Sequence, residues 1–404
     1  MDNKLYAYWL CSVPGVGNRT IEKLQKIFGT AEQIYHATEE EWAQVLKASQ
    51  LEEMKQHKLD WNIQEEYNKM ETQGIRFLLK EDEDYPKRLL HIPDAPYGVF
   101  VKGNMPEENQ LSVAIIGARD CSEYGRYVAQ ALGKCMGENG VQVISGMARG
   151  IDGISQEAAL HAGGASFAVL GSGVDVCYPA QNRALYDQIQ KQGGILSIYP
   201  PGTEPRPQNF PPRNRIVSGL ADVVVVIEAR QKSGTLITVD MALEQGKEVY
   251  VVPGRITDRL SDGCNKLMKQ GAGVVLSPKD FLEEIKELWK SQSQLKDSGQ
   301  LQKRQPKEQE LLPQEKEETI KRQGQGSEKD FNTMKKKTVT EIPEELQEVY
   351  DLLDFYPKSV EQLLEQLPKR YDVTSLNTAL MRLCLDKQVL QVSPGHFCRN
   401  CRDE

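Results

Sequence analysis

Residues 112–152 read SVAIIGARDCSEYGRYVAQALGKCMGENGVQVISGMARGID, and this stretch decides the fold. A short apolar run, a glycine-containing loop, a segment with helical spacing and a second apolar run follow one another. The pattern repeats as far as residue 276, with apolar runs at 113–116, 141–144, 167–170, 195–198, 223–227 and 249–252. Apolar runs that alternate with helical segments predict the strands of a parallel sheet.

Function in such a fold should lie in the loops that follow the strands. Strands that are apolar on both faces need helices on both sides, and right-handed crossovers bring every strand-to-helix loop to the carboxyl edge of the sheet. We therefore predict an α/β fold in which a Rossmann-like, doubly wound parallel sheet occupies residues 112–290.

Composition limits the class of protein. The chain has 404 residues, of which 39% are hydrophobic, enough for two or three domains. The formal charge of -8 gives no global sign of a nucleic-acid partner, so a polyanion site must come from a local arrangement of Arg and Lys. Scattered cysteines without a secretory signal favour reduced thiols and a cytoplasmic protein, and no segment reaches transmembrane length, so no membrane partner is expected.

The residues before the sheet predict a helical domain and a connector. Residues 1–75 contain a glycine turn at 13–17 typical of a helix-hairpin-helix (SAM-like) domain. The glycines would let backbone amides approach a phosphate, but a plain tight turn between packed helices explains the pattern equally well. The prolines of the connector, 76–111, argue against a helix, and residues 97–101 suit an edge strand.

The residues after the sheet predict a linker and a second module. A helix should begin at Pro278, and residues 291–340, rich in Gln, Lys and Glu, predict a disordered linker. Three helical runs and a hairpin over 341–397 suit a winged-helix domain for protein contact or weak DNA contact, with a tail at 398–404. Cys398 and Cys401 form one CxxC, but a structural zinc site needs four ligands, so we predict no metal site.

The first two loops of the sheet suit phosphate. Where a dinucleotide-binding loop would have its middle glycine, the first loop has Arg119, a long cation for a phosphate lying further out. The second loop places glycines around Arg149 at a helix start and can form an anion nest, while Asp152 also suits the role of helix cap. The candidate residues of these loops are Gly117, Arg119, Ser122, Ser145, Gly146, Arg149, Gly150 and Asp152.

The fourth loop, 199–215, predicts a contact with a single strand. Three Arg face one carboxylate there, with Tyr199 and Phe210 among them. Guanidinium groups suit a phosphate backbone and rings suit unstacked bases, although a rigid proline-rich crossover with solvated Arg would look similar. The candidates are Phe210, Arg213, Asn214 and Arg215, joined by Ser233, Gly234 and Thr235 at the helix start of the fifth loop. We find no catalytic motif, no catalytic residue and no cofactor motif.

Together these motifs resemble the DNA-processing protein A (DprA/Smf) family of bacterial natural transformation. The matching segments, in order, are 117–119, Ser122, 124–125, 145–152, 178–179 with Asn182, 210–216, 218–220, 233–238, 244–246 and 252–254. Two positions depart from the family pattern, Ser155-Gln156 in place of Ala-His and Ile198 in place of a Glu; neither removes an Arg.

The resemblance implies a protein without enzymatic turnover that binds single-stranded DNA without sequence preference and protects incoming DNA. It also implies that the protein loads RecA recombinase, forms a homodimer through the Rossmann-like domain and uses no cofactor. Arg183 joins the DNA-binding candidates on this basis. Two alternatives remain. The first is a nucleotide-binding or nucleotide-hydrolysing Rossmann protein of the lysine-decarboxylase-like group, which would need a Glu at the position of Thr238. The second is a protein that only senses a nucleotide.

Two expectations follow for the site. Removing Arg119 or Arg213 should weaken DNA binding without unfolding the protein, because both are expected to face phosphate. Residues 76–290 alone should keep most of the binding, because every candidate loop belongs to the sheet.

Overall fold

The computed structural model describes residues 3–297, 343–353, 358–368, 370–386, 388–393 and 395–399. The chain forms two compact units, residues 1–307 and 308–404. Most of the predicted linker and Cys401 lie outside the described residues. Among the described residues, no helix combines the length and apolar character needed to cross a membrane.

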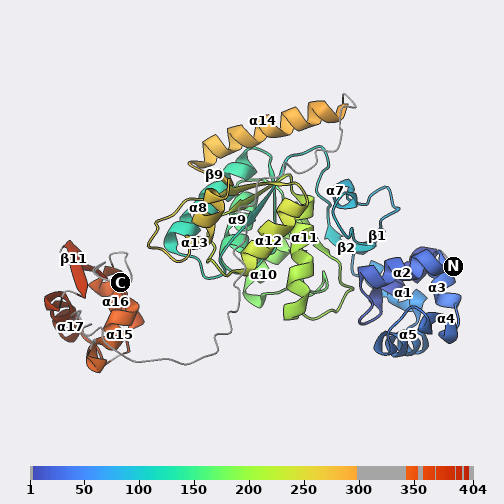
Figure 1. The fold of residues 1–404 in the computed structure, drawn as a ribbon, viewed down its shortest axis with the longest axis horizontal. Helices are drawn as coiled ribbons and strands as arrows, with labels where there is room; N and C mark the ends of the chain where they lie inside the picture. The colour runs from blue at the N-terminus through green and yellow to red at the C-terminus, as the bar shows by residue number, and fades with distance from the viewer. Residues whose placement is uncertain are drawn as a thin grey trace, which may run out of the picture. The chain divides into compact units, whose positions relative to one another are not determined.

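The predicted parallel α/β sheet is confirmed and forms the centre of the first unit (Figure 1). The six predicted strands all form and pair in parallel, in the order β6-β5-β4-β3-β7-β8. The order changes direction between β3 and β7, which is where such sheets bind ligands. The bounds are β3 (Ser112–Ile116), β4 (Gln142–Ser145), β5 (Ser166–Leu170), β6 (Gly193–Ser197), β7 (Val223–Val226) and β8 (Glu248–Val251).

Three further strands extend the sheet to nine. The connector strand β2 (Gly98–Gly103) pairs antiparallel with β6, and β1 (Ile75–Leu79) pairs antiparallel with β2. The connector strand is therefore internal, and the edge belongs to β1, which the sequence did not predict. At the other end β9 (Gly273–Val274) pairs with β8.

Alternate residues of the strands point to opposite faces, as a pleated strand requires. Val113 and Ile115 pack on one face and Ala114 and Ile116 on the other. Apolar residues of α8, α9 and α14 share the first core, and those of α11 and α12 share the second. The helices of this domain are α8 (Glu123–Glu138), α9 (Ile151–His161), α10 (Arg183–Gln192), α11 (Phe210–Leu220), α12 (Gly234–Glu244), α13 (Asp262–Lys269) and α14 (Pro278–Asp297).

Among the described residues, six helices precede β1. They are α1 (Asn3–Ser12), α2 (Asn18–Phe28), α3 (Ala31–His36), α4 (Glu39–Ala43), α5 (Ala48–Asp60) and α6 (Ile63–Thr72). Their core is continuous with that of the sheet, because buried Leu5 and Trp9 of α1 belong to the same cluster as Phe77, Phe100 and Ile195 of β1, β2 and β6.

Two details of the connector and the last helix correct the sequence prediction. The connector contains a short helix, α7 (Lys87–Leu90), which begins directly after Pro86; a proline at that place loses no helical hydrogen bond. Helix α14 continues to Asp297, several residues into the segment that the sequence assigned to the linker.

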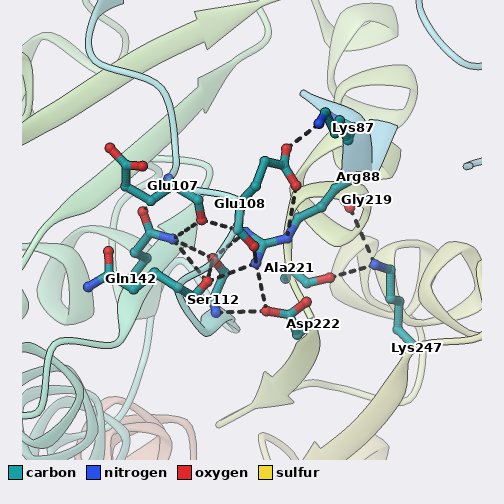
Figure 2. A network of polar contacts seen from close by, with 11 residues as sticks. Lys87, Arg88, Glu107, Glu108, Ser112, Gln142, Gly219, Ala221, Asp222 and Lys247 are labelled. Carbon is teal, nitrogen blue, oxygen red and sulfur yellow. Dashed lines mark hydrogen bonds and ion pairs between the residues drawn. The ribbon is translucent and has the colours of Figure 1, made fainter. Parts of the chain in front are cut away.

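A polar network fastens α7 to the amino edge of the sheet (Figure 2). Arg88 donates to the carboxylate of Asp222 at 3.1 Å and to the hydroxyl of Ser112 at 2.7 Å, and it also reaches the backbone oxygens of Glu108 and Gln110. Asp222 in turn accepts from the Ser112 amide at 2.9 Å. The network ties together the amino ends of β3 and β7, at the edge opposite the candidate loops.

Among its described residues, the second unit contains three helices and a small sheet. Helices α15 (Glu344–Leu352), α16 (Val360–Gln366) and α17 (Val373–Leu385) surround a core of their own. Strands β10 (Lys358–Ser359), β12 (His396–Arg399) and β11 (Val389–Ser393) form an antiparallel sheet in that order.

Candidate functional site

Two adjoining cavities lie at the carboxyl edge of the sheet, where the strand order changes direction. Their volumes are about 480 and 310 Å³. Both are lined by residues that come from four different strand-to-helix loops: Arg119, Gly146, Ala148, Tyr178, Phe210 and Arg213. Loops that are far apart in the sequence therefore meet at one place, as the parallel sheet predicted.

An exposed cation and two rings stand at the boundary between the cavities. The guanidinium of Arg119 lies over the ring of Phe210, with 5.4 Å from Cζ to the ring centroid. The ring of Tyr178 lies 5.8 Å from that of Phe210, and its side chain is 42% exposed. A guanidinium beside aromatic rings is an arrangement that can bind both a phosphate and an unstacked base.

Tyr178 is a site residue that was not among the sequence candidates, although the segment 178–179 is one of the family-like motifs. It belongs to the loop between β5 and α10, and that motif was the signal that could have found it. In contrast, Tyr199 of the fourth loop is half-buried and does not line either cavity. Its hydroxyl donates to the Asn209 backbone oxygen at 3.1 Å, so that ring supports the loop.

Arg213 differs from the expected solvent-facing cation. It is only 4% exposed, and its guanidinium donates to the backbone oxygens of Gly146, at 2.8 Å, and Val169. Burial lowers the pKa of the Arg213 guanidinium to about 10. Arg213 thus lines both cavities and holds the second loop against β5.

Arg215 points away from the cavities. Its guanidinium bonds the backbone oxygen of Asp94 and lies 4.0 Å from that carboxylate, so it fastens α11 to the connector. Burial lowers its pKa, and Asp94 partly offsets the effect. Of the three arginines of the fourth loop, only Arg206 is exposed, and Asn214 lines the larger cavity.

The second loop is closed by a buried carboxylate. The Gly146 amide donates to Asp152 at 3.1 Å, and the N-cap of α9 is Gly150 at φ 73°, so Asp152 holds the loop and does not cap the helix. Burial raises the pKa of Asp152, and Arg213 opposes the rise. The Ser145 hydroxyl donates to the Ile115 backbone oxygen at 2.6 Å, which is a structural role in the core.

The unusual Ser155-Gln156 pair has a structural explanation. Gln156 accepts a hydrogen bond from the Met147 amide at 3.1 Å and donates to the Phe167 backbone oxygen at 3.0 Å. Met147 has a positive φ of 53°, a conformation that side chains rarely adopt without support. Gln156 therefore holds the second loop in place from inside.

The remaining candidates lie around the cavities or apart from them. Arg149 lines the smaller cavity and pairs with Asp120 at 3.4 Å. Arg183, the first residue of α10, pairs with Asp187 at 3.3 Å and lines neither cavity. Ser122 caps α8 and hydrogen-bonds Glu228, and it also lies outside both cavities.

The start of α12 closes the larger cavity. The Ser233 hydroxyl accepts from the Thr235 amide at 3.1 Å, and Thr235 donates to the Gly117 backbone oxygen at 3.3 Å. The structure thus brings to the cavities Gly117, Arg119, Gly146, Arg149, Asp152, Phe210, Arg213, Asn214, Ser233, Gly234 and Thr235. It places Ser122, Ser145, Gly150, Arg183 and Arg215 outside the lining.

The described residues hold no group of three or more His, Cys, Asp or Glu side chains placed to bind a metal ion. Thr238, at the position where the nucleotide-hydrolase alternative would want a Glu, is buried beside the larger cavity. The site presents arginine side chains, aromatic rings and backbone amides.

Comparison with known proteins gives matches over most of the first unit. A family model described as DNA recombination-mediator protein A matches residues 76–286. The DNA processing protein DprA of Streptococcus pneumoniae is 41% identical over 226 residues, 56% of this chain and 78% of that protein. The Bacillus subtilis protein of the same name is 40% identical over 216 residues, 53% of this chain and 73% of that one. The X-ray structure of the Streptococcus pneumoniae protein superimposes with a TM-score of 0.60 at 34% identity, over 70% of this chain and 98% of that chain.

Proposed function

The chain belongs to the DNA recombination-mediator protein A family, and from this premise we propose that it binds single-stranded DNA without sequence preference at the two cavities. Its role is in DNA processing and recombination. The finer steps of the proposal are protection of incoming DNA and loading of RecA recombinase onto the bound strand.

One observation carries the proposal: the exposed Arg119 guanidinium stands over the Phe210 ring, with the Tyr178 ring beside it. A guanidinium supplies charge for the backbone, and stacking on a ring is tolerant of sequence because every base has a π-face. Arg149 and the start of α12 supply a second cation and backbone amides on either side. This arrangement suits a strand whose bases are already unpaired.

The flanking modules have secondary parts in this proposal. The α1–α2 hairpin belongs to a helix-hairpin-helix-like domain, 1–75, and the second unit to a winged-helix domain, 341–397, that tunes partner choice. The domain around the sheet, 112–290, forms the homodimer, with RecA as the protein partner. The family description as a recombination mediator supports a recombinase as partner.

The nucleotide-hydrolysing alternative is not favoured. Thr238 has no titratable group, and it lies where that class needs a carboxylate. We therefore propose that the protein acts by binding, without enzymatic turnover.

Fluorescence anisotropy with labelled oligo-dT, and with a duplex of equal length, tests the proposal. Affinity for oligo-dT should exceed that for duplex and fall steeply with salt, because bound cations displace counterions from several phosphates. Equal affinity for both, or no dependence on salt, contradicts it.

Arg119→Ala tests the site. It should weaken oligo-dT binding by about 1.5 to 3 kcal/mol, the range for a hydrogen bond to a charged group, and lower the salt slope by about 0.7 for each phosphate that the protein no longer neutralises. Arg126→Ala is the matched control, because Arg126 is a half-exposed cation on α8 that lines neither cavity. If both variants lose affinity equally, general charge and not this site binds the strand.

A further inference from the structure

A carboxylate occupies the helix start at which a fold of this kind seats a phosphate. Glu228 is the second residue after β7, at the point where the strand order changes direction, and it is 1% exposed. It accepts a hydrogen bond from the Ser122 amide at 2.9 Å and another from the Ser122 hydroxyl. The same hydroxyl accepts from the Gly125 amide at 3.0 Å. Glu228 therefore sits against the first turn of α8.

The sequence around this turn is fitted to that carboxylate. A Cβ at position 125 would lie 2.4 Å from the carboxyl carbon of Glu228, so Gly125 is needed for the close approach. Ser122 both caps α8 and bonds Glu228, which explains its place outside the cavities. Ser122, Gly125 and Glu228 thus pack against one another, although they come from two segments that are distant in the sequence.

The position matters because α8 follows the first strand of the doubly wound part of the sheet. In nucleotide-binding folds of this topology the phosphate lies at the amino end of that helix, where free amides and the helix dipole attract an anion. Here the amide of Ser122 is already hydrogen-bonded to an internal carboxyl group. The side chain of Arg119, from the preceding loop, is exposed at the cavities instead.

We propose that Glu228 is a specificity-determining residue, whose carboxyl group occupies the α8 amino end and excludes the phosphate of a mononucleotide from that position. The β3–α8 loop then binds phosphate through Arg119, whose long side chain suits successive phosphates along a polymer. This inference rests on the proposed function and explains why a fold shared with nucleotide-binding proteins would bind a strand and not its monomer.

Three variants of the full chain test the inference. Glu228→Ala empties the position, Glu228→Gln fills it without charge, and Glu123→Gln removes an exposed carboxylate, 90% exposed, from the same turn of α8. The melting temperature of each is measured with increasing inorganic phosphate, against potassium chloride at matched ionic strength. Circular dichroism establishes that each variant is folded.

Folded Glu228→Ala should gain a saturable rise in melting temperature with phosphate, because a ligand that binds only the native state stabilises it. Wild type and Glu123→Gln should show a smaller rise, because they retain only the phosphate contacts of the cavities. A rise in Glu228→Gln as well would show that charge alone excludes the phosphate; a rise in Glu228→Ala only would show that occupied space contributes. No rise in folded Glu228→Ala, or an equal rise in wild type, overturns the inference.

If Glu228→Ala does not fold, the inference is tested by competition between thymidine monophosphate and labelled oligo-dT for the wild-type protein. Thymidine monophosphate should leave labelled oligo-dT bound even at a large excess of nucleotide, and displacement at equal nucleotide concentration would overturn the inference. Failure of the proposed function is distinguishable, because wild type would then show no preference for oligo-dT over duplex or no dependence on salt, whereas the phosphate response of Glu228→Ala does not depend on DNA.

Discussion

Arg213 and Arg215 lie two residues apart in α11, but their side chains have different surroundings. Arg213 is buried between the second loop and β5, whereas Arg215 holds the connector through Asp94. Arg119, which has no such partners among the hydrogen bonds of the described residues, is exposed at the cavities. Arg119 is therefore a better candidate for direct contact with DNA than Arg213 or Arg215.

Arg213→Ala should destabilise the first unit, contrary to the expectation from sequence. The change leaves the Gly146 and Val169 oxygens without their donors and the buried Asp152 without a nearby cation. Breaking such an arrangement costs about 3 to 5 kcal/mol, measured as the free energy of urea unfolding. Arg206→Ala, an exposed arginine of the same loop, is the control and should unfold like wild type. Unchanged stability with a loss of DNA affinity would mean that the Arg213 guanidinium is available to the strand after all.

Glu228 should make stability depend on pH. Burial raises its pKa in the folded protein, even though the hydrogen bonds from Ser122 oppose the rise. The folded state therefore holds this proton more tightly than the unfolded state does. The resulting stabilisation is complete below the ordinary glutamate pKa of about 4.3 and is lost as the pH rises through the folded value.

Glu228→Gln has no such titration and serves as the reference. The unfolding free energy of wild type minus that of Glu228→Gln should fall between about pH 4 and neutrality, as measured by urea unfolding at several pH values. A difference that rises over this window would show that the carboxylate is stabilised in the ionised form and that its pKa is lowered.

At the scale of single residues, the sequence showed which loops hold the site but not which side chains reach it. Loops after parallel strands must meet at one edge, so Gly117, Arg119 and Phe210 could be placed together from the pattern alone. Whether an Arg turns inward depends on carbonyl oxygens from other loops, as for Arg213. That information lies in the tertiary packing and has no local signal.

At the scale of elements, strands buried on both faces were the most predictable feature. Their apolar runs are continuous and are separated by helical segments, so the start and end of β3 to β8 were close to those expected. Strand β1 was missed because its short apolar run comes only two residues after the helical region ends. It pairs only with β2. Helix α7 was missed because prolines on both sides suggested an extended connector.

Arg88→Ala tests how much α7 contributes as a clamp. The Arg88 side chain is 10% exposed and that of Asp222 is 16% exposed, so the pair is largely shielded from water. Removing one partner of a buried pair costs about 3 to 5 kcal/mol, to be measured by urea unfolding. Oligo-dT affinity of the folded variant should remain, because Ser112 and Asp222 of this network (Figure 2) lie at the amino ends of β3 and β7, whereas the cavities lie at the carboxyl edge.

Lys87→Ala is the matched control for that experiment. Lys87 is the neighbouring cation of α7, its side chain is exposed, and only its backbone amide bonds Glu108. It should unfold like wild type. Equal losses of stability in the two variants would point to the helix itself and not to the Arg88 network as the source of stability.

At the scale of the whole molecule, the sequence suggested that residues 76–290 would suffice, and the packing argues for a larger fragment. A cut at residue 76 removes the first residue of β1 and all six preceding helices. Phe77, Phe100 and Ile195 would lose the cover that Leu5 and Trp9 share with them. Each large apolar side chain exposed in this way costs about 1.5 to 3 kcal/mol, so the shorter fragment should be unstable.

Residues 1–297 should bind oligo-dT as the full chain does, within about threefold, or 0.65 kcal/mol. They include every element that lines the two cavities and the helices that complete the core beneath the sheet. Anisotropy gives the affinity of 1–297, 76–290 and the full chain, and urea unfolding separates a fragment that does not fold from a folded fragment that binds weakly. A folded 1–297 fragment that binds more than about a hundredfold more weakly than the full chain, roughly 2.7 kcal/mol, would assign the main DNA contact to the second unit, because the cavities themselves would be intact.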